Sequence, residues 1–359
     1  MKINNKIIHS KFLYIFFTFL SLINFFFSTA KLEASAFNIK NIEISKPFEI
    51  NFDKNEIIDE GFKKGFEELI SLITTSSDRK KIDKIRINQI KGMIESFSVK
   101  EEKFVNQIYY VNLGVSFNRK KIFNYLENKN IFPSIPINKK FFFLPIIIDE
   151  NKNDLLIFNN NKLIKQWNEY LKSFHLIEYI LPTEDLEDIN LIKRNYEYIE
   201  KYDFKEITKK YNLENSIIAL IFKNENEIRI LSRIRIKDKT ILKNQSFTDI
   251  NIDNDIKVEK LINNLKIIYE DLWKESNQIN TSIKLTLNIK VSNVNNLKIS
   301  KFEKILNAND LVYDYFISKF DRDFTYYQII FNSDPNEFLK NMNDKDYSFN
   351  TQNKIWILK

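Results

Sequence analysis

The feature that most constrains this chain is a continuous apolar run of strand length, Phe141 to Asp149, near the middle of the sequence. An apolar run without alternation is typical of a strand that is buried on both faces of an α/β sheet. Pro145 interrupts the run. Because proline has no backbone N–H to donate, we expect the middle of the strand to be irregular or to face an edge of the sheet. The sequence therefore predicts a central, helix-covered sheet built around this strand.

Patterns on either side of the run divide the chain of 359 residues into four segments. Residues 1–36 are predicted to be a signal peptide, 37–132 an N-terminal α+β unit, 141–279 a central α/β domain, and 280–359 a C-terminal βαββαβ unit. The predicted fold class is α/β and α+β. It combines a central mixed-sheet α/β domain with two small ferredoxin-like α+β units that flank it.

In the central domain, helices alternate with strands before a meander begins. Ser216 to Phe222 is a second apolar strand, and residues 227–236 alternate between isoleucines on one face and arginines on the other. The apolar spacing predicts one helix from Leu163 to Phe174 and another from Val258 to Leu272. Strands that alternate with helices and then form a meander predict a mixed sheet covered by helices.

The two flanking units share an order of elements. Residues 37–132 follow the order β-α-β-β-α, and Gly61 and Gly65 lie in the first helix, where missing side chains would let the helix approach the sheet. Residues 280–359 follow the order β-α-β-β-α-β, with a helix start at Asp334-Pro335 and a closing strand from Lys354 to Leu358. The shared order predicts a structural repeat.

The N-terminus has the pattern of an export signal. Three lysines in the first eleven residues precede an apolar stretch from Phe12 to Phe27, and Ala34-Ser35-Ala36 supplies the small residues that signal peptidase requires. This predicts a periplasmic protein that begins at Phe37 and has no transmembrane segment after cleavage. The alternative is an uncleaved signal that anchors the protein in the inner membrane, because Phe12 to Ala30 could just span a bilayer.

Composition excludes several classes of site and partner. The chain has no Cys, which excludes disulfides and thiolate-based metal sites. Of the formal net charge of +7, residues 1–36 contribute four lysines against one glutamate, and only eight residues of the chain are Arg. We expect no nucleic-acid partner, because such a partner requires clustered positive charge. Without a G-x-G-x-x-G, P-loop or H-E-x-x-H motif, we expect no cofactor.

An extended start after the signal, a Pro-containing apolar strand and a Pro-containing acidic loop form one pattern along most of the chain. The segments that carry it are Phe37-Asn38-Ile39, Leu69 to Thr74, Phe143 to Asp149, the turn at Asn161 with the helix at Trp167, and Leu181 to Asp188. In these segments the chain resembles an exported proteobacterial family, an uncharacterised periplasmic family catalogued only as a domain of unknown function. Thr183-Glu184 departs from the Gly-containing turn of that pattern. The resemblance implies the architecture and the compartment, and it brings no catalytic residues.

A loop rich in acidic residues follows the strand predicted at 177–181. Clustered carboxylates bind hard cations, or raise one another's pKa for acid–base catalysis. Asp185, Glu187 and Asp188 are therefore candidate metal ligands of a hydrolase, with Glu184 beside them. The alternative is an acidic N-terminal cap of the helix that begins near Leu186, which the helix dipole favours by itself.

Three of the eight arginines, Arg229, Arg233 and Arg235, fall on one face of the strand at 227–236. This face is a candidate binding site for an anionic partner, such as a phosphate-bearing lipid of the envelope. The alternative is the solvated face of an antiparallel strand. His175 is the only histidine of the predicted mature chain, and we assign it a structural role at a helix end.

These observations lead to two hypotheses of function. The first is a non-enzymatic periplasmic binding or envelope-assembly protein with a protein or envelope-lipid partner. The second is a carboxylate- or metal-dependent hydrolase that uses the acidic loop at 184–188. Geometry distinguishes them, because an enzyme needs those carboxylates to converge in a concave site with a further polar group.

Overall fold

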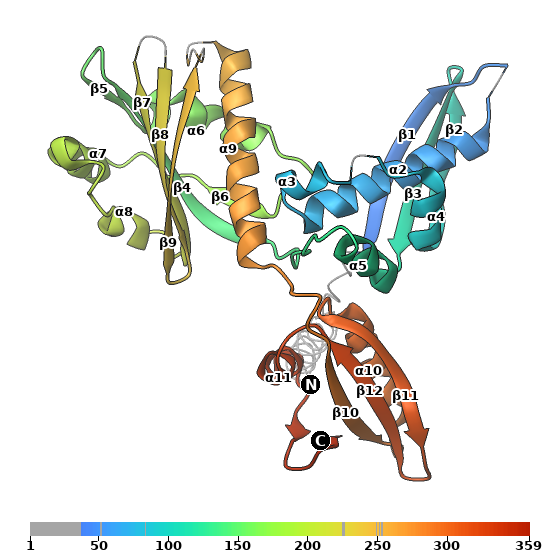
Figure 1. The fold of residues 1–359 in the computed structure, drawn as a ribbon. Coiled ribbons are helices and arrows are strands. Elements are labelled where there is room, and N and C mark those ends of the chain that lie inside the picture. The colour runs from blue at the N-terminus through green and yellow to red at the C-terminus, as the bar shows by residue number, and fades with distance from the viewer. Residues whose placement is uncertain are drawn as a thin grey trace, which may run out of the picture.

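The computed structural model describes residues 37–50, 52–82, 84–224, 227–248, 250, 252 and 254–359. Its three sheets form three lobes, as Figure 1 shows. The first sheet is built from residues 38–117, the second from 139–248 and the third from 285–358. The predicted α/β and α+β class with a mixed central sheet is confirmed. The predicted signal peptide at 1–36 lies outside the described residues.

The middle of the central sheet is the predicted apolar strand. Strand β4 (Lys139–Asp149) pairs in parallel with β7 (Asn215–Lys223), and the antiparallel strands β8 (Glu227–Ile236) and β9 (Lys239–Thr248) extend the sheet beyond β7. On its other side, β4 pairs with two shorter strands, β6 (Ile177–Ile180) along its first half and β5 (Asp154–Leu156) along its second half. Every residue from Phe141 to Asp149 is consequently buried.

The gap between β6 and β5 falls at Pro145. Its carbonyl group accepts a hydrogen bond of 2.9 Å from Nδ2 of Asn161, a side chain with no exposed surface. The same amide nitrogen donates to the carbonyl group of Leu156 at 3.3 Å, and Oδ1 accepts from the N–H of Leu163 at 2.9 Å. The irregular middle predicted from Pro145 is confirmed, and Asn161 supplies the hydrogen bonds that an adjacent strand would have made.

Helices cover both faces of the central sheet. Helices α9 (Asp255–Ser276) and α6 (Lys162–Gln166) pack on one face, and Figure 1 shows α9 running the length of the strands. The other face is covered by α7 (Leu186–Arg194), a 3₁₀ turn (Tyr196–Tyr198) and α8 (Lys205–Lys209). Each face therefore has its own apolar core.

The single helix predicted from Leu163 to Phe174 is wrong. Helix α6 ends at Gln166, a 3₁₀ turn (Trp167–Glu169) follows, and the chain then enters the loop before β6. The ammonium group of Lys266 in α9 binds the carbonyl groups of Trp167, at 2.6 Å, and Tyr170, at 2.9 Å. Because a continuous helix would use these carbonyl groups internally, the contact with α9 favours the early end.

The N-terminal unit is an antiparallel sheet with the order β1 (Asn38–Pro47), β3 (Ile108–Phe117), β2 (Ile94–Val105). Its helices are α2 (Lys54–Ile73), α3 (Ser76–Arg79), α4 (Ile87–Met93) and α5 (Arg119–Glu127). Helix α2 lies against the sheet at its two glycines. A Cβ atom at Gly65 would lie 2.7 Å from Cδ1 of Ile42, and one at Gly61 would overlap Leu113, which confirms the close approach predicted from these glycines.

The C-terminal unit is a sheet in the order β11-β12-β10-β14-β13. Its elements are β10 (Leu285–Ser292), α10 (Asn296–Ala308), β11 (Val312–Phe320), β12 (Phe324–Phe331), α11 (Pro335–Asn343), β13 (Phe349–Asn350) and β14 (Trp356–Leu358). The predicted Asp334 is the N-cap of α11, and its side chain accepts from the N–H of Asn336 at 2.8 Å.

The predicted closing strand is β14, which takes the position beside β10. It runs parallel to β10, whereas a strand entered directly from α11 would run parallel to β12 and hence antiparallel to β10. The chain first passes along the outer edge as β13 and then turns back. The sequence pattern missed β13 because two residues are too few to show alternation.

The first and third units share the strand order first, third, second, which agrees with the predicted repeat. Their buried apolar side chains form one continuous core. Arg119, at the start of α5, fixes the junction by donating to the carbonyl groups of Asn309, of Asn307 at 2.8 Å and of Val312 at 2.8 Å. The two units are therefore packed as one body.

Helix α9 connects the central sheet to the N-terminal unit. Asp271 accepts a hydrogen bond of 2.8 Å from the N–H of Ser76, at the start of α3. One turn further, the buried ammonium group of Lys274 donates to the carbonyl group of Ser71, near the end of α2. Burial lowers the pKa of Lys274 to about 8, because the charged form of the ammonium group is less favourable in this junction than in water.

Candidate functional site

The predicted arginine stripe lies on β8, on the face of the central sheet that α7 and α8 cover. Arg229, Arg233 and Arg235 are each partly buried. The strand register places Arg235 directly between Ser216 of β7 and Thr240 of β9. Residues that oppose one another in a sheet project from the same face, so two hydroxyl groups flank the base of this side chain.

The chain from residue 199 to residue 213 crosses over these arginines. Arg233 donates to two backbone carbonyl groups of this segment, that of Tyr202 and, at 2.7 Å, that of Glu200. Arg235 donates to the carbonyl group of Leu213 at 3.3 Å. The interpretation of the stripe as a plain solvated face is therefore wrong, because the arginines hold the segment 199–213 on the sheet.

Arg229 makes separate contacts. Its guanidinium group pairs with the carboxylate of Glu200 at 2.7 Å and stacks over the ring of Phe222 at 4.0 Å. Arg229 does not line the pocket that Arg233 and Arg235 share. Arg229 thus lies on the same strand as Arg233 and Arg235 and carries the same charge, but its side chain has different neighbours.

A pocket of about 270 Å³ lies between the segment 199–213 and the sheet. Its floor is buried and its walls are partly buried, whereas its rim is exposed. The lining residues are Thr208, Ser216 and Ile218 on the floor, Arg233 and Arg235 in the walls, and Lys201, Asp203, Lys205 and Thr240 at the rim. Four of these described residues are cations and one is an acid, so the lining carries a formal charge of +3.

The acid of the rim is already paired. Asp203 lies 2.9 Å from the ammonium group of Lys205, and the hydrogen bond from Lys205 lowers the pKa of Asp203. Asp203 is consequently ionised at neutral pH and offsets one of the four positive charges. The charges of Lys201, Arg233 and Arg235 face the pocket without a second carboxylate among its described lining residues.

Arg235 also has a donor without a partner. Among the described residues, its Nε is buried and has no hydrogen-bond acceptor. Leaving a buried guanidinium N–H unsatisfied is unfavourable, and an anionic oxygen is the acceptor that satisfies it best. The pocket therefore combines an excess of positive charge with an unused buried donor.

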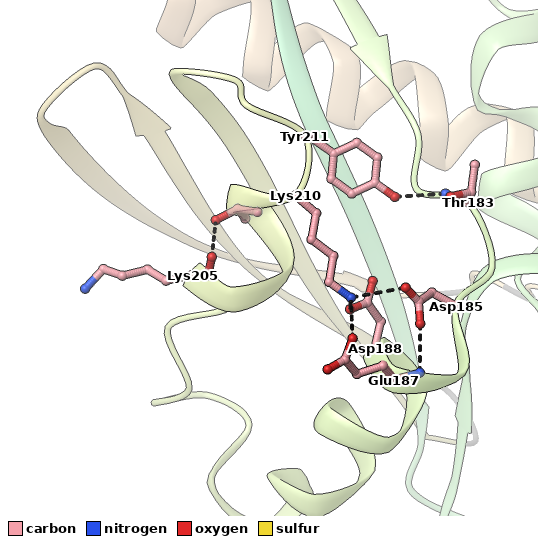
Figure 2. Close-up of polar contacts among 8 residues, drawn as sticks. Thr183, Asp185, Glu187, Asp188, Lys205, Lys210 and Tyr211 are labelled. Carbon is pink, nitrogen blue, oxygen red and sulfur yellow. Dashed lines mark hydrogen bonds and ion pairs between the residues drawn. The ribbon is translucent and has the colours of Figure 1, made fainter.

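The acidic loop converges on a lysine. Figure 2 shows three carboxylates around the end of the Lys210 side chain, whose Nζ lies 3.1 Å from Asp185, 3.1 Å from Glu187 and 2.8 Å from Asp188. Asp185 is also the N-cap of α7 and accepts from the N–H of Glu187 at 2.8 Å. The hydrogen bond with Asp188 raises the pKa of Lys210, and the hydrogen bond with Lys210 lowers the pKa of Asp185.

The candidate metal ligands Asp185, Glu187 and Asp188 are thus brought together, with an ammonium group at their centre. In the part of the chain that the structure describes, no group of three or more His, Asp or Glu side chains is arranged to hold a metal ion. Asp185 is the N-cap of α7, as the helix-cap alternative predicted. The arrangement neutralises the loop and fixes Lys210.

Helix α8 lies between the basic pocket and the acidic loop. Lys205 and Thr208 line the pocket, and Lys210 follows the helix directly. The hydroxyl group of Thr208 donates to the carbonyl group of Lys205, at 3.3 Å. Before the helix, Phe204 has a φ of 56° and a fully buried ring, which fixes the chain at that point. The acidic loop therefore anchors one end of α8, and Arg233 anchors the segment before it.

Sequence reasoning identified Arg233 and Arg235 and missed Lys201, Lys205 and Thr240. Lys201 lies in the turn before α8 and Lys205 is the first residue of that helix, and nothing in their spacing connects them to β8. Thr240 was within reach, because a two-residue turn at 237–238 places it opposite Arg235. His175 lies in the loop before β6, where its Nδ1 accepts from the N–H of Lys172 at 3.3 Å.

No family model matches the chain, and no curated protein matches it in sequence. The resemblance to an exported periplasmic family stays a prediction. Within the described residues, no helix has the length and apolar character to cross a membrane.

Proposed function

We propose that the protein is a non-enzymatic binding protein that takes a small oxyanion into the pocket between α8 and β8. The observation that supports this most directly is the lining itself, where four cations face one carboxylate and Nε of Arg235 has no acceptor among the residues that the structure describes. Guanidinium groups present several donors in a fixed plane that suits phosphate and carboxylate groups. The hydroxyl groups of Ser216 and Thr240 stand beside Arg235 as further donors.

The proposal includes the periplasmic location predicted from residues 1–36. In that compartment, soluble phosphate esters and the phosphate groups of envelope lipids are both available ligands. The pocket is small beside the roughly 300–1,000 Å³ typical of small-molecule sites, which favours a single anionic group over a large ligand. We also propose that the protein binds this anion without a cofactor.

The hydrolase hypothesis has less support. A general acid needs a raised pKa, whereas the hydrogen bond with Lys210 lowers the pKa of Asp185. A metal would have to displace the ammonium group of Lys210, which lies within 3.1 Å of all three candidate ligands. We therefore assign the acidic loop the role of positioning α8.

Calorimetric titration tests the proposal. Inorganic phosphate is added to the protein at low ionic strength, with chloride at the same ionic strength as the reference. We expect saturable binding of one phosphate per chain, weakened by added salt because the attraction is between charges. A titration with phosphate that gives the same heats as the chloride reference, on folded protein, would contradict it.

A further inference from the structure

We infer that the anion is the phosphate monoester headgroup of a membrane lipid, and that the rim of the pocket rests on the membrane surface. This inference rests on the proposed function. It commits to a lipid over a soluble phosphate ester, and three features of the pocket's mouth carry it.

The first feature is an exposed apolar side chain, Leu242, next to the arginine wall of the pocket. The register places Arg233 between Ile218 of β7, on the pocket floor, and Leu242 of β9. These three residues project from the same face of the sheet. Leu242 is 61% exposed, so the row runs from a buried floor, past a cation, to an apolar side chain in solvent. A ligand whose phosphate lies beside Arg233 would have its substituent next to Leu242.

The second feature is the charge of the surrounding surface. Lys237, in the turn after β8, and Lys239, at the start of β9, are exposed on either side of the exposed Asp238, so these three residues add a net charge of +1. The exposed Lys201 and Lys205 form the opposite rim. Lysines around an apolar side chain are the usual composition of a surface that binds an anionic leaflet.

The third feature is the small volume of the pocket together with the number of hydrogen-bond donors that line it. A pocket of about 270 Å³ accommodates a headgroup and leaves the remainder of a lipid outside. A phosphate monoester has three terminal oxygens and carries between one and two negative charges near neutral pH, which suits a lining with a formal charge of +3. A phosphodiester headgroup has two free oxygens and a single charge, so it satisfies fewer of these donors.

Vesicle sedimentation tests the inference. The full chain is mixed with phosphatidylcholine vesicles that contain either phosphatidic acid, a monoester, or phosphatidylglycerol, a diester, at matched surface potential. We expect about tenfold tighter binding to phosphatidic acid. Every variant carries the same residues 1–36, so differences between variants and between vesicles report on the pocket and its rim.

Two variants separate the lipid inference from the proposed function. Leu242→Ser should weaken vesicle binding several-fold and leave the phosphate titration unchanged. Ile256→Ser, a matched exposed apolar residue on α9 at the opposite face, should leave both unchanged. Arg235→Gln should weaken both.

The outcomes are distinct. Phosphate binding without a preference for phosphatidic acid over phosphatidylglycerol would overturn the lipid inference and leave the proposed function standing. Vesicle binding that Leu242→Ser does not weaken would overturn the placement of the rim on the membrane. Absence of both phosphate and vesicle binding would overturn the proposed function as well.

Discussion

Nζ of Lys210 lies 2.8 Å from the carboxylate of Asp188, which is 1% exposed, so a lysine occupies the centre of the acidic loop. This contact changes the role of the loop. The carboxylates that could have formed a metal site instead hold the residue that follows α8. The same short helix supplies Lys205 and Thr208 to the basic pocket. One site thereby positions the other.

Replacing Lys210 with Met should lower the thermal midpoint by several degrees, because the buried carboxylate of Asp188 loses its cation. The variant should also bind phosphate more weakly, since α8 loses its anchor. Lys209→Met, an exposed neighbour in α8, is the control for removing one charge. Differential scanning calorimetry measures the effect, and a Lys210→Met midpoint equal to that of Lys209→Met would contradict the anchoring role.

Asn161→Ala should reduce the free energy of unfolding by about 2–6 kcal/mol. It leaves the carbonyl group of Pro145 and the N–H of Leu163 without their partner, and each buried unsatisfied group costs about 1–3 kcal/mol. The exposed Asn160→Ala should stay within about 0.5 kcal/mol of wild type. Urea denaturation of the two variants decides it, and equal values would mean that Asn161 does not complete the sheet at Pro145.

Alanine at two glycines should have opposite effects. Gly65→Ala places a Cβ atom 2.7 Å from Cδ1 of Ile42, and because this buried side chain has to shift, the gain in helix propensity is outweighed and we expect a net loss of about 1 kcal/mol. Gly92→Ala, in α4, places a Cβ atom that has no described neighbour within 4 Å, and it should stabilise by about 0.5–1 kcal/mol through helix propensity. If chemical denaturation shows both variants to be stabilised, α2 does not approach the sheet as closely as described.

The pH dependence of stability should carry a contribution from His175. Burial, with the nearby cations Lys266 and Lys172, lowers the pKa of His175 to about 4, below its ordinary value of 6.5. Between these values the unfolded chain binds a proton that the folded chain does not, so stability falls as the pH drops from about 6.5 to about 4. His175→Gln should lose this part of the slope. Parallel curves for wild type and variant across this range would contradict the shifted pKa.

The architecture was largely predictable because the apolar patterns are long. The run from Phe141 to Asp149 and the alternation at 227–236 each specify an element, its type and its buried face. The glycines of α2 and the N-cap Asp334 also act through local geometry, which a sequence shows directly. Short elements such as β13 escaped because two residues carry no pattern.

The candidate site was only half predictable. The alternation placed Arg233 and Arg235 on one face, but it could not show that the segment 199–213 covers them. Likewise the acidic cluster at 184–188 was visible, whereas Lys210, more than twenty residues further on, was not connected to it. Both sites depend on contacts between elements that are distant in the sequence. Such contacts follow from how the elements pack, which the local pattern does not show.

The comparison of Arg235→Gln with Arg229→Gln in a phosphate titration tests the central claim most directly. Both substitutions remove one guanidinium group from the same face of β8, and only Arg235 lines the pocket. We predict that Arg235→Gln weakens phosphate binding at least tenfold, whereas Arg229→Gln retains the wild-type affinity. Equal affinities in the two variants, with both folded, would contradict the assignment of the pocket as the anion site.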